Sequence, residues 1–160
     1  MSARARRHHR KGAIVEIDLG VLGRTYARLL EPPLAEFLDV VISDAAEPTD
    51  HERIKTAPVL FRINIMRSSW PIVIMENLTD VEPMPVMRYF RQDALTGELS
   101  IVTAEPGRTD RSERPATLAE CEKLEPWAVW DISHVEDRLR DHVLGVPNKW
   151  VTSLRPRNSG

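Results

Sequence analysis

Residues 12–19 read GAIVEIDL, and this stretch decides the class of fold. Val15, Ile17 and Leu19 alternate here with two acidic residues. Because side chains two positions apart lie on the same face of a β-strand, the pattern predicts a strand with one apolar face and one face in water. The fold is therefore expected to begin with a β-sheet.

Further strands are predicted on the C-terminal side of this stretch. Gly20 and Gly23 bracket a short connection, where glycine supplies the positive φ that a tight hairpin needs. The nearly unbroken apolar run at 70–75 predicts a strand that is buried on both faces. Apolar or alternating segments predict strands at 24–30, 34–42, 58–66, 70–75, 87–91, 99–103 and 127–131.

Two helices are predicted near the C-terminus. Thr117 and Glu120 have the capping-box spacing, in which a hydroxyl and a carboxylate satisfy unpaired backbone N–H groups at a helix start. Ser133 and Glu136 repeat that spacing before a longer amphipathic segment. Gly145 is placed to end this second helix, because glycine readily adopts the left-handed conformation of a C-cap.

These segments together predict an α+β fold made mainly of antiparallel strands. The expected architecture is a curled sheet or partly open barrel with one or two C-terminal helices. Residues 1–11 are interpreted as a disordered basic arm and residues 12–160 as a single globular domain. In that domain, residues 12–103 are expected to form the β core, and residues 104–160 a polar loop, the helices and a C-terminal tail.

Composition and charge limit the functions to be considered. The chain has 160 residues, of which 42% are hydrophobic and 29% charged, and its formal net charge is −2. Five basic residues in the first eleven contribute +5, so residues 12–160 carry −7. An acidic body argues against a nucleic-acid groove, which needs clustered lysine and arginine. With no apolar run long enough for a membrane span and no secretory leader, the expected location is the cytoplasm.

The residues give no support for catalysis, a metal site or a cofactor. Cys121 is the one cysteine and is expected to be a small buried hydrophobic residue. His134 and His142 lie eight positions apart on a predicted helix, which is poor geometry for a shared metal ion. Two carboxylate pairs are expected on solvated faces: Glu36 with Asp39, and Asp137 with Asp141. We therefore expect a protein that is not an enzyme.

An acidic segment is the remaining candidate for a functional surface. Residues 43–55 are polar, contain a proline and are interpreted as an exposed loop. Carboxylates gathered on one loop create a negative potential that steers a basic partner toward it. Four residues of this loop are therefore predicted to bind the partner: Asp44, Glu47, Asp50 and Glu52. A plain solubilising loop is the alternative interpretation.

The predicted strands carry a resemblance to a known family. The motifs, in order, are GAIVEIDL at 12–19, YAR at 26–28, LAEFLD at 34–39, PVLFRI at 58–63, the strand that begins at Trp70, and YFRQD at 89–93 before Gly97. Through them the chain resembles bacterial immunity proteins of polymorphic-toxin systems, of the type called immunity protein twenty-six. The resemblance covers roughly residues 10–103, and it lies in strand motifs rather than in reactive groups.

This resemblance implies a cytoplasmic antidote, a protein that binds a cognate toxin domain and blocks it. The acidic body suggests that the toxin is a basic nuclease whose nucleic-acid groove the immunity protein would occupy. Two alternatives remain open: a nucleic-acid-associated accessory protein that uses the basic N-terminal arm, or a non-catalytic binding domain of another kind. No membrane partner is expected, and the oligomeric state is left open.

Overall fold

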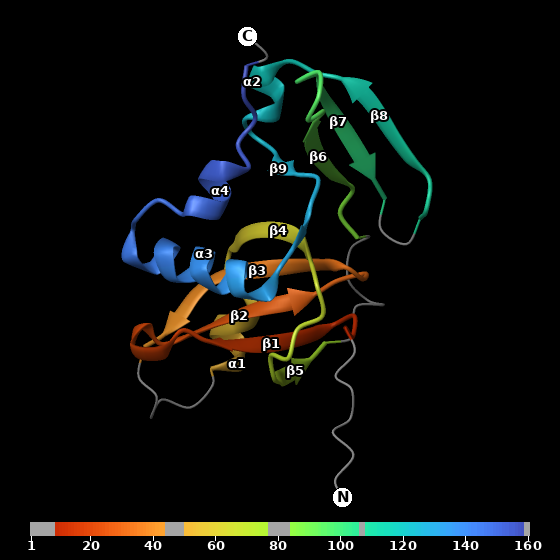
Figure 1. Ribbon diagram of the computed structural model, residues 1–160. Helices are drawn as coiled ribbons and strands as arrows, with labels where there is room; N and C mark the ends of the chain where they lie inside the picture. The colour runs from red at the N-terminus through yellow and green to blue at the C-terminus, as the bar shows by residue number, and fades with distance from the viewer. Residues whose placement is uncertain (1–8, 44–49, 77–83, 106–107, 159–160) are drawn as a thin grey trace, which may run out of the picture.

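The computed structural model describes residues 9–43, 50–76, 84–105 and 108–158, which form two β-sheets and several short helices (Figure 1). The first sheet has the order β10-β4-β3-β2-β1-β5, with β1 (Ala13–Asp18), β2 (Arg24–Leu29), β3 (Leu34–Ile42), β4 (Val59–Ile65), β5 (Ile72–Met75) and β10 (Val129–Trp130). The second sheet has the order β8-β7-β6-β9, with β6 (Met87–Gln92), β7 (Leu99–Ala104), β8 (Arg111–Pro115) and β9 (Glu125–Pro126). The helices are η1 (Gly20–Leu22), α1 (His51–Lys55), α2 (Leu118–Cys121), α3 (Ile132–Leu144) and α4 (Lys149–Ser153).

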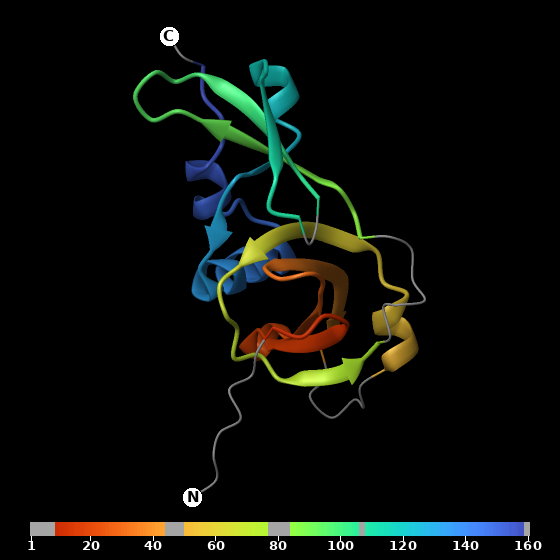
Figure 2. The same cartoon turned by 90° about the vertical axis from the view of Figure 1, so that its right-hand side faces the viewer.

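The predicted α+β class with mainly antiparallel strands is confirmed. The first sheet curls, as Figure 2 shows, but neither sheet closes into a barrel. The predicted hairpin between β1 and β2 is also confirmed, with Glu16 opposite Tyr26. Gly23 is required in its turn, because its φ is +107° and a Cβ there would lie 2.6 Å from the carbonyl oxygen of Ile42.

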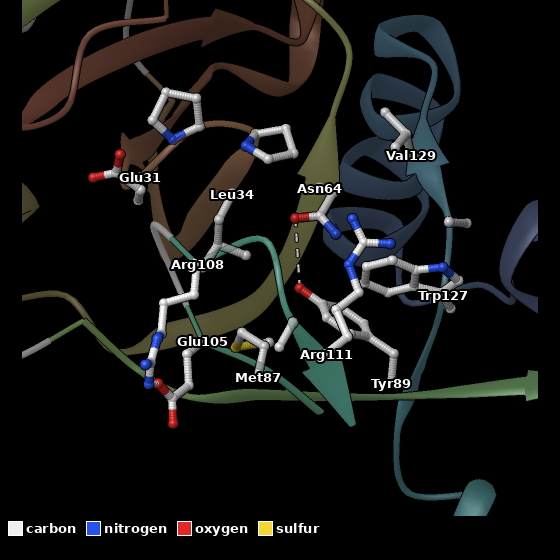
Figure 3. Close-up of a pocket in the computed structure, with 14 residues that line it drawn as sticks. Glu31, Leu34, Asn64, Met87, Tyr89, Glu105, Arg108, Arg111, Trp127 and Val129 are labelled. Carbon is white, nitrogen blue, oxygen red and sulfur yellow. Dashed lines mark hydrogen bonds and ion pairs between the residues drawn. The ribbon is translucent and has the colours of Figure 1, made fainter. Parts of the chain in front are cut away.

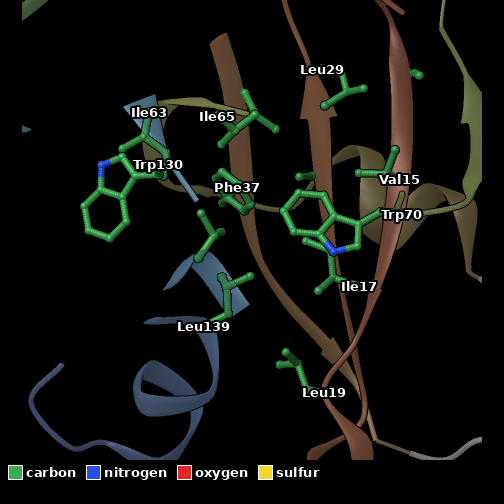
Figure 4. Close-up of a cluster of buried hydrophobic side chains, with 14 residues drawn as sticks. Val15, Ile17, Leu19, Leu29, Phe37, Ile63, Ile65, Trp70, Trp130 and Leu139 are labelled. Carbon is green, nitrogen blue, oxygen red and sulfur yellow. The ribbon is translucent and has the colours of Figure 1, made fainter. Parts of the chain in front are cut away.

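The first sheet carries buried clusters on both faces, so the face of residues 13–19 that was predicted to be wet is wet only in part: Asp18 is exposed and Glu16 half-buried, but Ile14 is fully buried. Val15, Ile17 and Phe37 belong to a large cluster with Trp70 and with Leu139 of α3 (Figure 4). The opposite face carries a second cluster: Ile14, Tyr26, Leu38, Val40, Ile42, Ile74 and Ile54 of α1. Ile14 is covered because the curled sheet and α1 bring Ile74 and Ile54 into the same cluster, which alternation within one strand cannot reveal.

Strand β5 also differs from its prediction. The run at 70–75 was expected to be buried on both faces, but β5 pairs only with β1 and forms an edge of the first sheet. Met75 is 53% exposed, and Ile72 and Val73 are only partly buried. The run is apolar because Trp70 packs in one core cluster and Ile74 in the other. An edge strand can make both contacts, so the apolar run does not require a central strand.

Three features of the C-terminal third were predicted incorrectly. The supposed loop at 104–115 contains β8, whose five residues are all exposed and pair with β7. Of the strand predicted at 127–131 only Val129–Trp130 forms a strand, β10, and the unpredicted β9 lies just before that range at Glu125–Pro126. The supposed tail contains α4. Each of these elements is short or lacks apolar alternation, so the sequence gives little local signal for it.

The helix signals were more accurate. Thr117 and Glu120 form a complete capping box at α2, as predicted. Helix α3 begins after Asp131, whose carboxylate accepts from the backbone N–H of Ser133, so Ser133 is not the N-cap. Gly145 ends α3 with φ +69° in the left-handed conformation, as predicted. No helix in the described part of the chain is long and apolar enough to cross a membrane.

Candidate functional site

A short segment around Trp127 pairs with both sheets. Strand β9 runs parallel to β6 in the second sheet, and β10, only two residues later, runs parallel to β4 in the first sheet. Trp127 and Ala128 lie between these two strands, so they are held at the junction of the sheets. The backbone N–H of Trp127 donates to the carbonyl oxygen of Phe90 at 2.8 Å.

A pocket of about 310 Å³ opens at this junction (Figure 3). Its lining comes from both sheets and from the segment around Trp127. Leu34 and Asn64 belong to the first sheet, and Tyr89 and Arg111 belong to the second sheet. The pocket thus exists only because these elements, which are distant in sequence, pack together.

Four side chains of the pocket form a chain of contacts. The hydroxyl of Tyr89 donates a long hydrogen bond of 3.5 Å to Oδ1 of Asn64. The Tyr89 ring meets the Trp127 ring edge to face, with 5.1 Å between centroids. The guanidinium of Arg111 lies over Trp127, with Cζ 4.6 Å from the ring centroid. Burial raises the pKa of Tyr89, so its hydroxyl stays protonated and remains a donor at neutral pH.

The other charges of the pocket are already paired. Arg108 donates to Glu105 at 2.9 Å, and Glu31 lies 3.3 Å from the ammonium group of Lys11. Among the described residues, Arg111 makes no ion pair. The arrangement therefore presents aromatic surface, a buried amide and one arginine whose N–H donors face no carboxylate.

The predicted acidic segment is only partly described. Asp50 is the N-cap of α1, and its carboxylate accepts from the backbone N–H of Arg53 at 3.1 Å. Glu52 is exposed. Residues 50–55 carry no net charge, since Arg53 and Lys55 balance Asp50 and Glu52. Asp44 and Glu47 lie outside the described residues, and neither Asp50 nor Glu52 lines the pocket.

The described carboxylates of the segment are therefore not brought together with the pocket. The interpretation of residues 43–55 as a loop was wrong for residues 51–55, which form α1. Ile54 causes this difference, because its side chain is fully buried in the second cluster and anchors the helix to the sheet. Of the predicted basic arm, residues 1–8 lie outside the described residues, and His9 contacts the carbonyl of Leu30 at 2.8 Å.

In the described part of the chain, Cys121, His134 and His142 contact neighbouring protein side chains. Cys121 is fully buried beside Phe90 and Ile101, as predicted, and burial raises the pKa of its thiol. His134 stacks on Trp150, and His142 lies 3.3 Å from Asp39. The described residues contain no group of three or more His, Cys, Asp or Glu side chains that would hold a metal ion.

The four carboxylates of the two predicted pairs differ in their exposure to solvent. Glu36 is 6% exposed and lies between Arg28, at 2.6 Å, and Arg62, at 2.7 Å. Asp137 accepts from the indole N–H of Trp150, and Asp141 accepts from the amide of Asn148. The prediction of a solvated face was therefore wrong for Glu36, whereas the side chains of Asp39 and Asp137 keep 53% and 45% of their surface exposed.

Sequence reasoning missed the pocket as a site. Tyr89 was noted only as part of the YFRQD motif of a predicted strand, and the structure buries it to 2% exposure. Trp127 fell in a predicted strand, which gave no sign that it stands between two sheets. Arg111 fell in a predicted loop, and no local signal marks its role, because its position depends on the pairing of β8 with β7.

Comparison of the chain with protein-family models, with curated proteins and with solved structures found no match. The function must therefore be argued from the geometry of this chain. The junction pocket is the place where that geometry is most specific, since its lining includes residues of six strands: β3, β4, β6, β7, β8 and β10.

Proposed function

We propose that this protein acts by binding a partner protein, and that the pocket at the junction of the two sheets lies at the centre of the contact. The partner is the toxin domain that an immunity protein neutralises, and a basic nuclease is the class that we favour. The action takes place in the cytoplasm of the cell that makes the toxin.

One observation carries this proposal: Trp127 is held between Tyr89 and Arg111 at a pocket that opens to the surface. Tryptophan, tyrosine and arginine are the residue types that most often dominate the energy of protein interfaces. Here the three are packed on one another before any partner arrives, so little conformational entropy remains to be lost on binding. Val129 beside the pocket is 53% exposed and adds apolar surface.

The probe is the C-terminal domain of a polymorphic toxin, which the proposal expects to be encoded beside this gene. We expect the full-length protein to bind this domain and to rescue growth of cells that express it. Trp127→Ala should weaken binding at least 30-fold, which corresponds to about 2 kcal/mol for a central interface residue. Leu95→Ala is the control, because Leu95 is 97% exposed at the tip of the β6–β7 hairpin.

Binding is measured by surface plasmon resonance, and thermal melting shows whether each variant is folded. Arg111→Ala is the second variant, because Arg111 is an exposed residue of an edge strand and its removal leaves the core intact. If both pocket variants bind the toxin domain as tightly as the Leu95→Ala control, the pocket is not the contact surface and the proposal fails.

The acidic segment has a separate test. Replacing Asp44, Glu47, Asp50 and Glu52 with Asn or Gln should slow association and flatten its dependence on salt, because rim charges act mainly on the association rate. The dissociation rate should change little. Unchanged association at low salt would remove this segment from the interface.

A further inference from the structure

Among the described residues that line the pocket, Arg111 is the charged residue without an ion pair, and it lies against the ring of Trp127. Arg111 projects from β8, and its guanidinium lies over the Trp127 ring with Cζ 4.6 Å from the centroid (Figure 3). The ring offers the guanidinium a π face and no carboxylate oxygen, so the N–H donors of Arg111 remain available to an acceptor. The planar fork of these donors matches the two oxygens of a carboxylate.

Nothing in the described chain supplies that acceptor. Arg108 is satisfied by Glu105, and Glu31 by Lys11. Among the described residues, the guanidinium of Arg111 contacts the Trp127 ring and pairs with no carboxylate. The described lining thus offers an unpaired cation beside two neutralised ion pairs, which favours an anionic occupant.

The walls near Arg111 are apolar. Met87, Ala104 and Arg111 are neighbours across β6, β7 and β8, because Met87 pairs with Ala104 and Ala104 pairs with Arg111. Leu34, which is 4% exposed, faces them from the first sheet. An occupant therefore meets a hydrophobic surface next to the cation, and this combination selects a charged group on an apolar stem.

The size of the pocket limits how large a bound group can be. A volume of about 310 Å³ lies at the lower end of the range of small-molecule sites, which is roughly 300–1,000 Å³. At the inner side, Asn64 is 8% exposed and its Oδ1 already accepts from Tyr89. Its amide N–H₂ group remains a donor, which also suits a carboxylate.

We infer that the pocket receives one aspartate or glutamate side chain of the partner protein, whose carboxylate pairs with Arg111 while its methylene groups pack on Leu34 and Met87. This inference rests on the proposed function, and it names the chemical group that the pocket recognises. The proposed partner has a positive net charge, but the pocket contacts only one of its side chains. A single aspartate or glutamate on an otherwise basic surface is enough to fill it.

The test with the protein alone uses hexanoate as the probe, an alkyl chain with a terminal carboxylate. Hexanamide is the neutral probe of the same shape. Both are titrated to millimolar concentration while NMR follows the indole N–H resonance of Trp127, assigned by its loss in Trp127→Phe. The indole of Trp70, which donates to Glu136 at 3.0 Å, is the internal reference.

We expect hexanoate to shift the Trp127 resonance in a saturable way and hexanamide to bind at least tenfold more weakly, because the amide lacks the charge that pairs with Arg111. Arg111→Gln should abolish this difference. Arg114→Gln is the matched control, because Arg114 lies on the opposite face of the same strand and pairs with Glu120 at 3.2 Å. Equal binding of both probes, or no binding of hexanoate, would overturn the inference.

The test with the partner separates this inference from the proposed function. Arg111→Gln should raise the dissociation constant for the toxin domain about 10- to 100-fold, and one Asp→Asn or Glu→Gln change in the toxin should have the same effect. The two changes combined should cost no more than either alone. If Trp127→Ala weakens toxin binding while Arg111→Gln leaves it unchanged, the carboxylate site is wrong and the docking surface stands.

Discussion

The two sheets of this protein differ in what holds them and in what they present. The first sheet is covered on both faces by large clusters, one around Phe37 and Trp70 and one around Tyr26 and Ile54. The buried cluster of the second sheet consists of Phe90, Ile101 and Cys121. Stabilisation by burial scales with the apolar area removed from water, so the first sheet contributes most of the stability.

The second sheet presents the groups suited to recognition. Its edge strand β8 is exposed along its whole length, and it carries Arg111 to the pocket. Tyr89 and Trp127 complete the aromatic surface there. The two sheets therefore differ in role. The first sheet, with the larger buried clusters, provides most of the stability, and the second sheet, with the smaller cluster, carries polar and aromatic side chains at the surface.

The largest expected effect comes from a matched pair of Phe→Ala substitutions. Phe37 is fully buried between Phe61, at 4.9 Å between centroids, and Trp70, at 6.0 Å. Phe37→Ala should lower the free energy of unfolding by about 3–5 kcal/mol because it leaves a cavity in the larger cluster. Phe90→Ala should cost less, since fewer buried side chains surround Phe90. Urea denaturation measures both, and a larger cost for Phe90 would reverse the comparison.

A second pair of variants compares one ion-pair network from each sheet. Glu36→Gln removes the charge between Arg28 and Arg62 in the first sheet, where Glu36 is 6% exposed. We expect a loss of about 2 kcal/mol, less than for a fully buried pair because Arg62 is partly exposed. Glu113→Gln, whose pair with Arg91 is exposed, should cost less than about 1 kcal/mol. Equal losses in guanidinium denaturation would show that burial does not decide the difference.

A third variant tests the helix that covers the second sheet. Thr117 caps α2, and its hydroxyl accepts from the backbone N–H of Glu120 while the Glu120 carboxylate accepts from the N–H of Thr117. Thr117→Ala should cost about 1 kcal/mol. Hydrogen exchange should show faster opening in β6 and β7 and no change in β2 and β3, because α2 packs on the second sheet. Equal acceleration in both sheets would mean that they open as one unit.

The smallest effect concerns pH and the helix that covers the first sheet. Hydrogen bonds from the side chain and backbone of Ser133 hold the pKa of Asp131 below its ordinary value. A carboxylate with a lowered pKa in the folded state contributes stability above its unfolded pKa of about 3.9, and this contribution is lost as pH falls through the folded pKa. The stability difference between the natural protein and Asp131→Asn should therefore shrink between pH 5 and acid conditions. A constant difference across that range would contradict the role of the charge.

Local signals were sufficient wherever neighbours in sequence decide the structure. The strand predicted at 34–42 is β3 with both ends correct, and the strands predicted at 87–91 and 99–103 are β6 and β7, each one residue longer at its C-terminal end. The capping box of α2 and the left-handed Gly145 were also predicted. These features depend on side-chain periodicity and on backbone preferences within a few residues, which a sequence displays directly.

Tertiary contacts decided what no local pattern contains. Strand β8 has charged side chains and no apolar alternation, so it exists because β7 offers it a hydrogen-bonding edge. Trp127 stands at the junction because β9 and β10 join different sheets. The sequence alone determined the class of fold, most of its strands and the helix ends. The junction pocket was decided only by the packing of the two sheets, because its lining comes from strands that are remote in the chain and meet only after folding.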